Sequence, residues 1–274
     1  MLISFLPLRI ISAIFALTIT DNIMTTDIRE YFPKRRTIRR YSDREVPAGL
    51  IDRLILEASH APTTGNMQLY SVVETRDPEG LRRLAPAHFN QPQVEGCKVA
   101  LTFCADFNRF SRWCEERRAE PCYDNLQSLV AATIDTIAFA QQFNTLAELN
   151  GLGVCWLGTT TYNAREIADA LSLPELVVPV ITLTVGYPAD EGQEVGRLPL
   201  DAVLHRETYQ PYTTERVNAL YAEKEARPDS KQFVKENSKE TLAQVFTDIR
   251  YPRANNELFS EKLIEYLKSS RFIK

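Results

Sequence analysis

The stretch of sequence that decides the fold is YDNLQSLVAATIDTIAFAQQFNTLAELN, residues 123–150. Its large apolar residues recur at the spacing of an α-helix, and alanines occupy most of the remaining faces. A helix that is apolar on most of its sides has to be covered, either by the core of its own domain or by a partner subunit. Gly151 follows directly and predicts the C-terminal end of this helix, which we expect to be the central element of the fold. The recurring apolar residues are Leu126, Leu129, Val130, Ile134, Ile137, Phe143 and Leu146.

Shorter elements are predicted on both sides of this helix. Residues 27–35 have the pattern of a short helix, and an amphipathic helix begins near Pro47. Asn163, followed three residues later by Glu166, predicts a capping box at the start of a helix over residues 164–171. Apolar runs of strand length complete the predicted core. They cover residues 69–75, 99–104, 152–157 and 178–185.

Composition divides the chain into three parts. Residues 1–23 form an apolar extension, residues 24–208 contain the predicted core, and residues 209–274 have the weaker apolar stripes of a helical C-terminal arm. Met24 precedes Thr-Thr-Asp, a sequence that opens helices well. We therefore expect translation to begin at Met24 and the extension to be an artefact of the gene start, with the apolar region of a signal peptide or a membrane anchor as the alternatives.

Several classes of function are disfavoured by charge and motifs. A net charge of −4 and a pI near 5.6 argue against a nucleic-acid surface. Five cysteines without a CxxC pair, and three histidines without an HExxH motif, argue against a metal site and suit reduced thiols in the cytoplasm. The GxGxxG, Walker and GxSxG motifs are absent from the sequence. An enzyme without an obvious side-chain catalyst is expected to use a cofactor.

A basic segment, KRRTIRRYSD at residues 34–43, stands out in this mildly acidic chain. Arg36 and Arg39 are three residues apart, so a turn-like backbone would direct both guanidinium groups to one side, where Thr37 adds a hydroxyl. Planar, permanently charged donors of this kind suit a phosphate group. The polar loop at residues 61–68 and the distant Arg197 are further candidate donors. Taken singly, each of these features is also typical of an ordinary solvated surface.

An ordered series of short segments resembles the FMN-dependent nitroreductase family. Their order, with Arg-Leu-Pro at 197–199 and a helical C-terminal extension, is similar to the larger subgroup of oxygen-insensitive NADPH nitroreductases and NADPH–flavin oxidoreductases. The resemblance runs from about residue 27 to the C-terminus and weakens beyond Tyr212. The segments are RRTIRRY (35–41), APTTGNMQ (61–68), FCADFNR (103–109), GLGVCWLG (151–158), LP (173–174) and GYPAD (186–190).

The resemblance implies an α+β fold, with a mixed central sheet flanked by helices, in a homodimer that holds FMN at the subunit interface. By position, the FMN phosphate and ribityl chain would lie against Arg35, Arg36, Thr37, Ile38, Arg39 and Arg197. The residues that would approach the flavin are Thr63, Gln68 and Gln91, and those along its isoalloxazine edge are Trp156, Leu157, Gly158 and Thr159. No side chain is expected to act as the catalyst. A backbone N–H near Gly158 or Thr159 would donate to flavin N5.

Two departures from the subgroup bear on this expectation. Val195 occupies a position where the subgroup commonly has Lys, and Thr161 one where it commonly has Arg. The arm that carries NADPH-selective arginines in the subgroup also aligns poorly here. A choice between NADPH and NADH is therefore left open.

The activity implied by the resemblance is transfer of hydride from NAD(P)H to nitroaromatics, quinones or flavins by a ping-pong mechanism. Specialised reactions of the same architecture, such as reductive dehalogenation or flavin fragmentation, are alternatives. A flavin-binding sensor or carrier with negligible turnover is a second alternative, and a membrane-tethered structural protein is a third.

Overall fold

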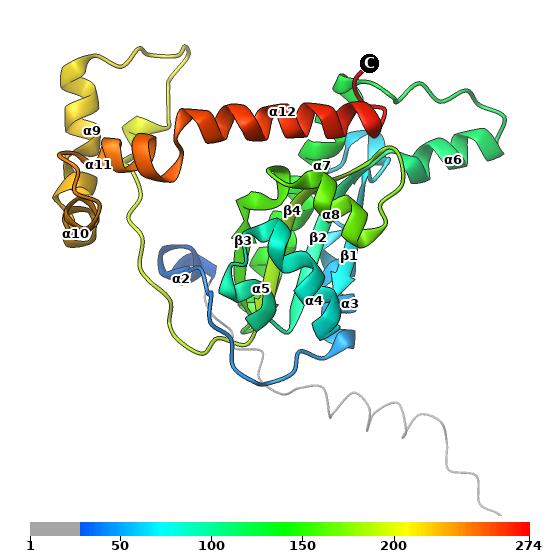
Figure 1. Ribbon diagram of the computed structural model, residues 1–274, viewed down its shortest axis with the longest axis horizontal. Helices are drawn as coiled ribbons and strands as arrows, with labels where there is room; N and C mark the ends of the chain where they lie inside the picture. The colour runs from blue at the N-terminus through cyan, green and yellow to red at the C-terminus, as the bar shows by residue number, and fades with distance from the viewer. Residues whose placement is uncertain (1–27) are drawn as a thin grey trace, which may run out of the picture.

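The computed structural model describes residues 28–274, and the predicted extension and start at Met24 lie outside them. Its centre is a four-stranded sheet in the order β1-β2-β4-β3 (Figure 1). The strands are β1 (Tyr70–Thr75), β2 (Val99–Asp106), β3 (Gly153–Leu157) and β4 (Val177–Gly186). All four strands lie where the sequence predicted them. The three strand pairs of this sheet are antiparallel, whereas the resemblance implied mixed pairing.

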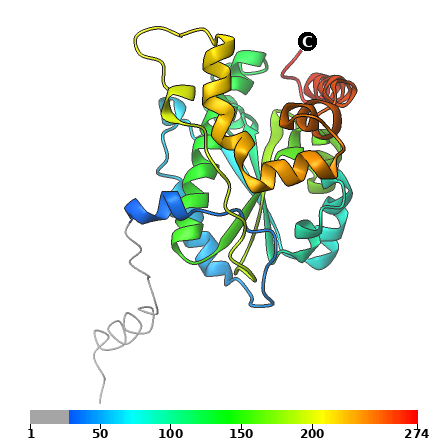
Figure 2. The ribbon, with the colours of Figure 1, turned by 90° about the vertical axis from the view of Figure 1, so that its left-hand side faces the viewer.

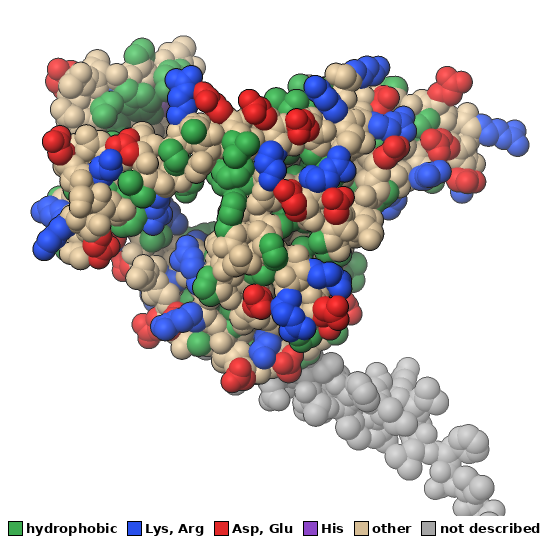
Figure 3. Space-filling model, in the orientation of Figure 1, with side chains coloured by type: hydrophobic (Ala, Val, Ile, Leu, Met, Phe, Trp, Pro, Cys, Tyr) green, Lys and Arg blue, Asp and Glu red, His purple; other side chains and the backbone are tan. Residues whose placement is uncertain are grey.

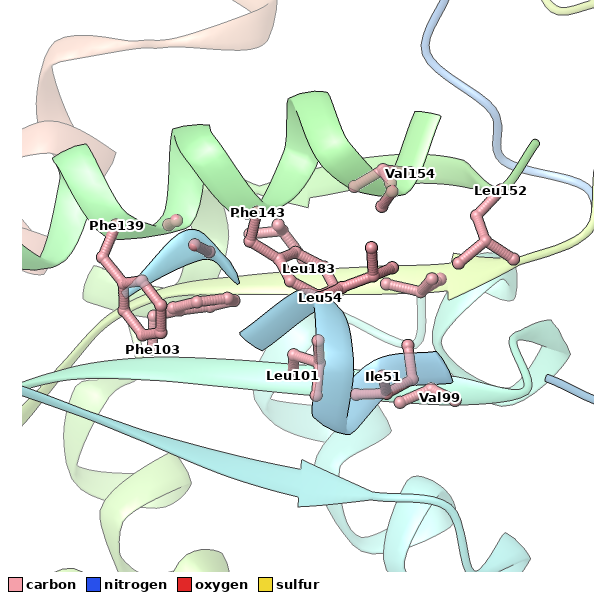
Figure 4. Packing of buried hydrophobic residues seen from close by; sticks show 14 of the residues in the cluster. Ile51, Leu54, Val99, Leu101, Phe103, Phe139, Phe143, Leu152, Val154 and Leu183 are labelled. Carbon is pink, nitrogen blue, oxygen red and sulfur yellow. The ribbon is translucent and has the colours of Figure 1, made fainter. Parts of the chain in front are cut away.

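Helices cover both faces of the sheet and give an α+β fold, as predicted (Figure 2). One face carries α3 (Ala48–Ala58) and α7 (Leu126–Leu149). On the other face lie α4 (Pro78–Leu84), α5 (Pro92–Gly96) and α8 (Ala164–Leu171). Figure 4 shows the main core between α7, α3 and the sheet, where Phe139 and Phe143 of α7 point toward Phe103 of β2. The Phe103 ring centroid is 5.3 Å from that of Phe139.

Helix α7 has two apolar faces. Asn125 caps its start, because the side chain accepts a hydrogen bond from Ser128 N, and Gly151 with φ +78° ends the turn that follows it. One face packs on the sheet, whereas an apolar stripe on the outer face is left uncovered in this chain. The stripe consists of Leu126, Val130, Ile134 and Ile137, whose exposed fractions are 56%, 44%, 63% and 38%. The core of this chain therefore covers one face of α7, and the partner subunit that the sequence analysis also considered could cover the other.

The basic segment lies across a pair of glycines in the sheet. Gly153 of β3 and Gly186 of β4 are register partners, and the Ile38 N–H donates to Val154 O at 3.2 Å. A Cβ at Gly153 would lie 2.6 Å from the Ile38 Cβ, and one at Gly186 would lie 2.8 Å from the Tyr41 ring. Side chains at either glycine would therefore lift the basic segment off the sheet.

The C-terminal helices begin after a long connection from β4. They are α9 (Thr214–Ala226), α10 (Pro228–Glu236), α11 (Leu242–Gln244), the π-helix η5 (Val245–Arg250) and α12 (Arg253–Ser269). In Figure 1, α9 to α11 stand to one side of the sheet, and α12 crosses its end. Tyr266, Leu267 and Phe272 are buried in a second core cluster with Phe107 and Val178, so the last helix is part of the core.

Short segments complete the described chain. The helices α2 (Ile28–Lys34) and α6 (Asn108–Glu116) precede and follow the first two strands. The 3₁₀ turns are η1 (Thr64–Asn66), η2 (Ala85–His88), η3 (Gly158–Thr161) and η4 (Leu200–Ala202). Basic and acidic side chains are interspersed over the face in Figure 3. Along residues 28–274, no helix combines the length and the apolarity needed to cross a membrane.

The predicted capping box at Asn163 and Glu166 is wrong. Helix α8 does start at Ala164, but Asn163 makes no side-chain cap. Its Nδ2 instead donates to Ala87 O at 2.8 Å, and its Oδ1 accepts from Lys262 Nζ at 2.7 Å. Lys262 also pairs with Glu166 at 2.7 Å. Tertiary partners thus replace the local cap, because they lie within reach of the same polar atoms.

We expect Gly153→Ala to lower the free energy of unfolding by about 2 kcal/mol, because the added methyl group overpacks against Ile38. Chemical denaturation with an unchanged m-value would measure the loss. Gly49→Ala is the matched control, since a Cβ there meets nothing within 4 Å. Equal stability of Gly153→Ala and the wild type would contradict the close approach.

Candidate functional site

A glycine, Gly158, directly follows the C-terminal end of β3, so the backbone there carries no side chain. Gly158 is exposed, and a Cβ built on it would meet no atom of the described chain within 4 Å apart from its two sequence neighbours. Its φ does not lie in the left-handed region, so the backbone conformation does not require a glycine. The missing side chain therefore leaves room beside the strand end, which suits the close approach of a flat group.

A polar network surrounds Thr159, the next residue. Its hydroxyl lies 2.9 Å from His88 Nδ1 and accepts from Gln91 Nε2 at 3.4 Å. The Gln91 side chain in turn accepts from Gln93 Nε2 at 2.7 Å. Of the residues predicted for the site, the structure therefore brings Gly158, Thr159 and Gln91 together.

Arg39 reaches this network through β3. Burial raises the pKa of the Cys155 thiol, and the neighbouring Arg39 and Gln93 oppose that rise without cancelling it. The thiol is therefore held protonated rather than as a nucleophilic thiolate. Arg39 is exposed, and among residues 28–274 it has no carboxylate partner.

The other predicted cations have different surroundings. Arg35 pairs with Glu148 at 3.0 Å, and Arg36 pairs with Glu194 at 3.1 Å. Within residues 28–274, Arg197 donates only to backbone carbonyls of the neighbouring residues 195 and 196. Thr37 bridges to residue 193, so the basic segment and residues 188–194 lie side by side. A hollow of about 430 Å³ between them is lined by cations and carboxylates together.

The remaining predicted residues differ in how much they expose. Ile38 and Leu157 are buried, so only their backbone could meet a ligand. The Trp156 indole N–H donates to Asn144 Oδ1 on α7 at 2.8 Å. Its side chain is half-buried and faces α7.

Thr63 and Gln68 lie in a separate place. Asp135 of α7 accepts from Thr63 Oγ1 at 2.5 Å and from Thr64 N at 2.9 Å, and Thr63 Oγ1 accepts from Gln68 N at 2.9 Å. In the described part of the chain, no hydrogen bond links this loop to Thr159. Asp135 directly follows Ile134, so the loop borders the exposed stripe of α7.

His88 and Asp135 contact residues of the candidate site, and the sequence analysis did not single them out. His88 is 0% exposed, and desolvation lowers its pKa to about 4, so the ring is neutral at pH 7. Its Nε2 has no hydrogen-bond partner among the described residues. The only local signal in the sequence was its position three residues before Gln91. Asp135 was hidden in an apolar helical pattern.

The sequence model of the Nitroreductase family matches residues 33–187, more than half of the chain. The chain belongs to the nitroreductase family. The FMN reductase (NADPH) of Bacillus subtilis (strain 168) is 34% identical over 182 residues, covering 66% of this chain and 73% of that protein. The oxygen-insensitive NADPH nitroreductase of Salmonella typhimurium is 30% identical over 188 residues, covering 69% and 76%.

A solved structure from Bacteroides fragilis NCTC 9343 extends the likeness beyond the family match. It is 53% identical to this nitroreductase-family chain with a TM-score of 0.87, and the alignment covers 88% of this chain and 98% of the other. The family match includes every predicted site residue except Arg197. The resemblance inferred from the sequence is therefore confirmed at the level of family and fold.

We expect the stability of this protein to fall by up to about 3 kcal/mol between pH 6.5 and pH 4 through His88 alone. Its pKa is depressed in the folded state, so the unfolded chain takes up the proton first as the pH falls. His88→Asn removes this contribution and should flatten the pH dependence of the free energy of unfolding in that window. Denaturation curves at several pH values measure it, with the exposed His60→Asn as control. A wild-type slope in His88→Asn would contradict a neutral buried imidazole.

Proposed function

We propose that this chain is an FMN-dependent oxidoreductase that uses NAD(P)H to reduce small planar acceptors such as nitroaromatics, quinones or flavins. The family membership and the names of the two curated relatives support this proposal. The observation that carries it is the exposed glycine backbone at Gly158, which lies beside the Thr159 network, at the end of the strand whose Cys155 is influenced by the charge of Arg39. Each part of FMN has a counterpart in this arrangement: Gly158 for the flat ring, the Thr159 network for the polar ring edge and Arg39 for the anionic tail.

The anionic end of FMN would be held by cations that have no carboxylate partner. Arg39 and Arg197 meet this condition among the described residues. Arg35 and Arg36 would contribute by exchanging Glu148 and Glu194 for phosphate, a stronger bidentate acceptor. Since Val195 supplies no charge where the subgroup has Lys, the arginines would carry the phosphate interaction alone.

The ring system would lie at the strand end. Gly158 would admit it because no side chain fills the space, and Gln91 and Thr159 would offer polar groups to its edge. Bound FMN would supply the redox chemistry, accepting hydride from NAD(P)H and passing the electrons to the acceptor in a ping-pong cycle. The protein's part is to orient the flavin, to neutralise its phosphate and to place hydrogen-bond donors at its ring. Backbone N–H groups near Gly158 and Thr159 would be the donors at flavin N5.

A homodimer is part of the same proposal. The exposed stripe of α7 is an apolar surface whose contact with water is unfavourable. The same stripe of a second copy would bury it in a symmetric interface. The loop with Thr63 and Gln68 borders this stripe, so dimerisation would carry it toward the partner's site. Residues 24–208 would form the FMN-binding core and residues 209–274 an arm whose last helix packs on it. Because all five cysteines are free, we also propose a reducing, cytoplasmic location.

An anaerobic absorbance spectrum tests the proposed function. We expect the purified protein to carry, or to take up, FMN and its yellow colour to bleach within seconds of adding NADPH or NADH. Comparison of the two nucleotides gives the preference that the sequence leaves open. A bound flavin that stays oxidised would favour a carrier or sensor, and a protein that does not bind FMN would overturn the proposal.

Replacing the arginines without carboxylate partners should weaken FMN binding most. We expect Arg39→Ala or Arg197→Ala to raise the FMN dissociation constant roughly 10- to 100-fold, because each loses charge-assisted hydrogen bonds. Fluorescence titration of the apoprotein measures this constant. Arg82→Ala, an exposed arginine on α4, is the control. Unchanged binding in both site variants would remove these arginines from the proposed phosphate site.

Placing a charge on the stripe should separate the subunits. We expect Ile134→Glu to raise the dimer dissociation constant at least about 100-fold, since a carboxylate would be buried without a partner. Sedimentation velocity at several concentrations measures the shift, and Arg82→Glu puts the same carboxylate on the opposite face of the sheet as control. A dimer of wild-type affinity in Ile134→Glu would exclude the stripe as the interface.

A further inference from the structure

His88 has an unusual set of contacts for a buried histidine. The side chain is 0% exposed, and its only hydrogen bond within the described part of the chain joins Nδ1 to Thr159 Oγ1 at 2.9 Å. The other ring nitrogen, Nε2, has no partner among the described residues. Buried polar atoms without a partner are rare, and a buried N–H without one is costlier than an acceptor lone pair without one.

Because an unpaired buried N–H costs more than an unpaired lone pair, the contacts of His88 favour one tautomer of its ring. A neutral imidazole carries its proton on one nitrogen only. If the proton were on Nε2, the structure would contain an orphaned buried N–H. With the proton on Nδ1, Nε2 is an unfilled acceptor, and His88 donates to Thr159.

The tautomer in turn fixes the Thr159 hydroxyl. Gln91 also donates to the same oxygen, and the orientation of its amide is set because its Oε1 accepts from Gln93 at 2.7 Å. The Thr159 oxygen therefore accepts two hydrogen bonds. Its own proton is left to point away from His88 and Gln91, and the Thr159 side chain is partly exposed on that side of the network.

The surrounding backbone is braced to keep this arrangement. Ala87 O, one residue before His88, accepts from Asn163 Nδ2, and Thr159 O accepts from Tyr162 N at 3.1 Å. The Phe259 ring of α12 stacks on Tyr162 at 4.5 Å and meets the edge of Phe89 at 5.8 Å. Both loops are thus tied to the same C-terminal helix.

We propose that His88 is a positioning residue that acts through Thr159, making the Thr159 hydroxyl an outward-pointing hydrogen-bond donor for an acceptor atom on the edge of the bound flavin. This inference rests on the proposed function and adds to it a role that no other residue of the network can take. Gln91 can donate to the Thr159 oxygen, but at 3.4 Å it does so weakly, and alone it leaves the hydroxyl free to rotate.

A double-mutant cycle on FMN binding tests the proposal. We expect His88→Leu to raise the FMN dissociation constant of the apoprotein roughly 5- to 10-fold and Thr159→Val to do the same, each through one hydrogen bond. In the Thr159→Val background, His88→Leu should then change the constant less than about 2-fold, because the hydroxyl on which it acts is gone. His88→Asn, whose amide nitrogen can occupy the place of Nδ1, should stay within about 2-fold of the wild type.

Two further readouts separate positioning from simple packing. Nitrogen NMR of the histidine-labelled wild type should report the Nδ1–H tautomer for His88, and the flavin midpoint potential should shift in His88→Leu but not in His88→Asn. An Nε2–H tautomer, additive effects in the cycle, or equal losses in His88→Leu and His88→Asn would each overturn the proposal. If His88→Leu does not fold, Thr159→Val and the NMR measurement still decide. A wild type that does not bind FMN would instead overturn the proposed function.

Discussion

The packing of α7 on the sheet is the constraint on which the rest of the structure depends. Its inner face supplies Phe139 and Phe143 to the main core. Three of its polar residues then each hold one segment of the candidate site. Asp135 binds the loop with Thr63, Asn144 binds Trp156, and Glu148 binds Arg35. Segments far apart in the sequence are therefore placed relative to one another by a single helix, whose outer apolar stripe is exposed in this chain.

Period and composition were enough to locate the four strands of the sheet and, of the helices on its faces, α3, α7 and α8. The strands and α7 were predicted because burial on defined faces imposes its own spacing on apolar residues. The resemblance to the family added the site positions around Gly158 and Arg39. The capping box at Asn163 failed because a local rule cannot include Lys262, which lies 99 residues further on.

The site residues that were missed share one property with Asn163. His88 and Thr159 are 71 residues apart, and Asp135 and Thr63 are 72 apart. A lone buried histidine, or one aspartate in an apolar helix, carries no periodic signal. The role of such a residue depends on contacts with residues that are distant in the sequence and come together only in the folded chain. The same holds for Arg35 and Arg36, whose charges looked available in the sequence but are balanced by Glu148 and Glu194 in the folded chain.

The docking of the last helix has a consequence for the order of folding. Tyr266 donates its hydroxyl to Val177 O across 89 residues, and Phe272, 1% exposed, fills the same cluster. The second core cluster cannot close while this segment is still being synthesised, although the main core between α3, α7 and the sheet already has all its members. The chain should thus leave the ribosome with its main core formed and its second core cluster still open. Phe107 and Val178 stay uncovered until the last segment docks. In that interval a chaperone, or a second nascent chain, would bind to the exposed apolar end of the sheet.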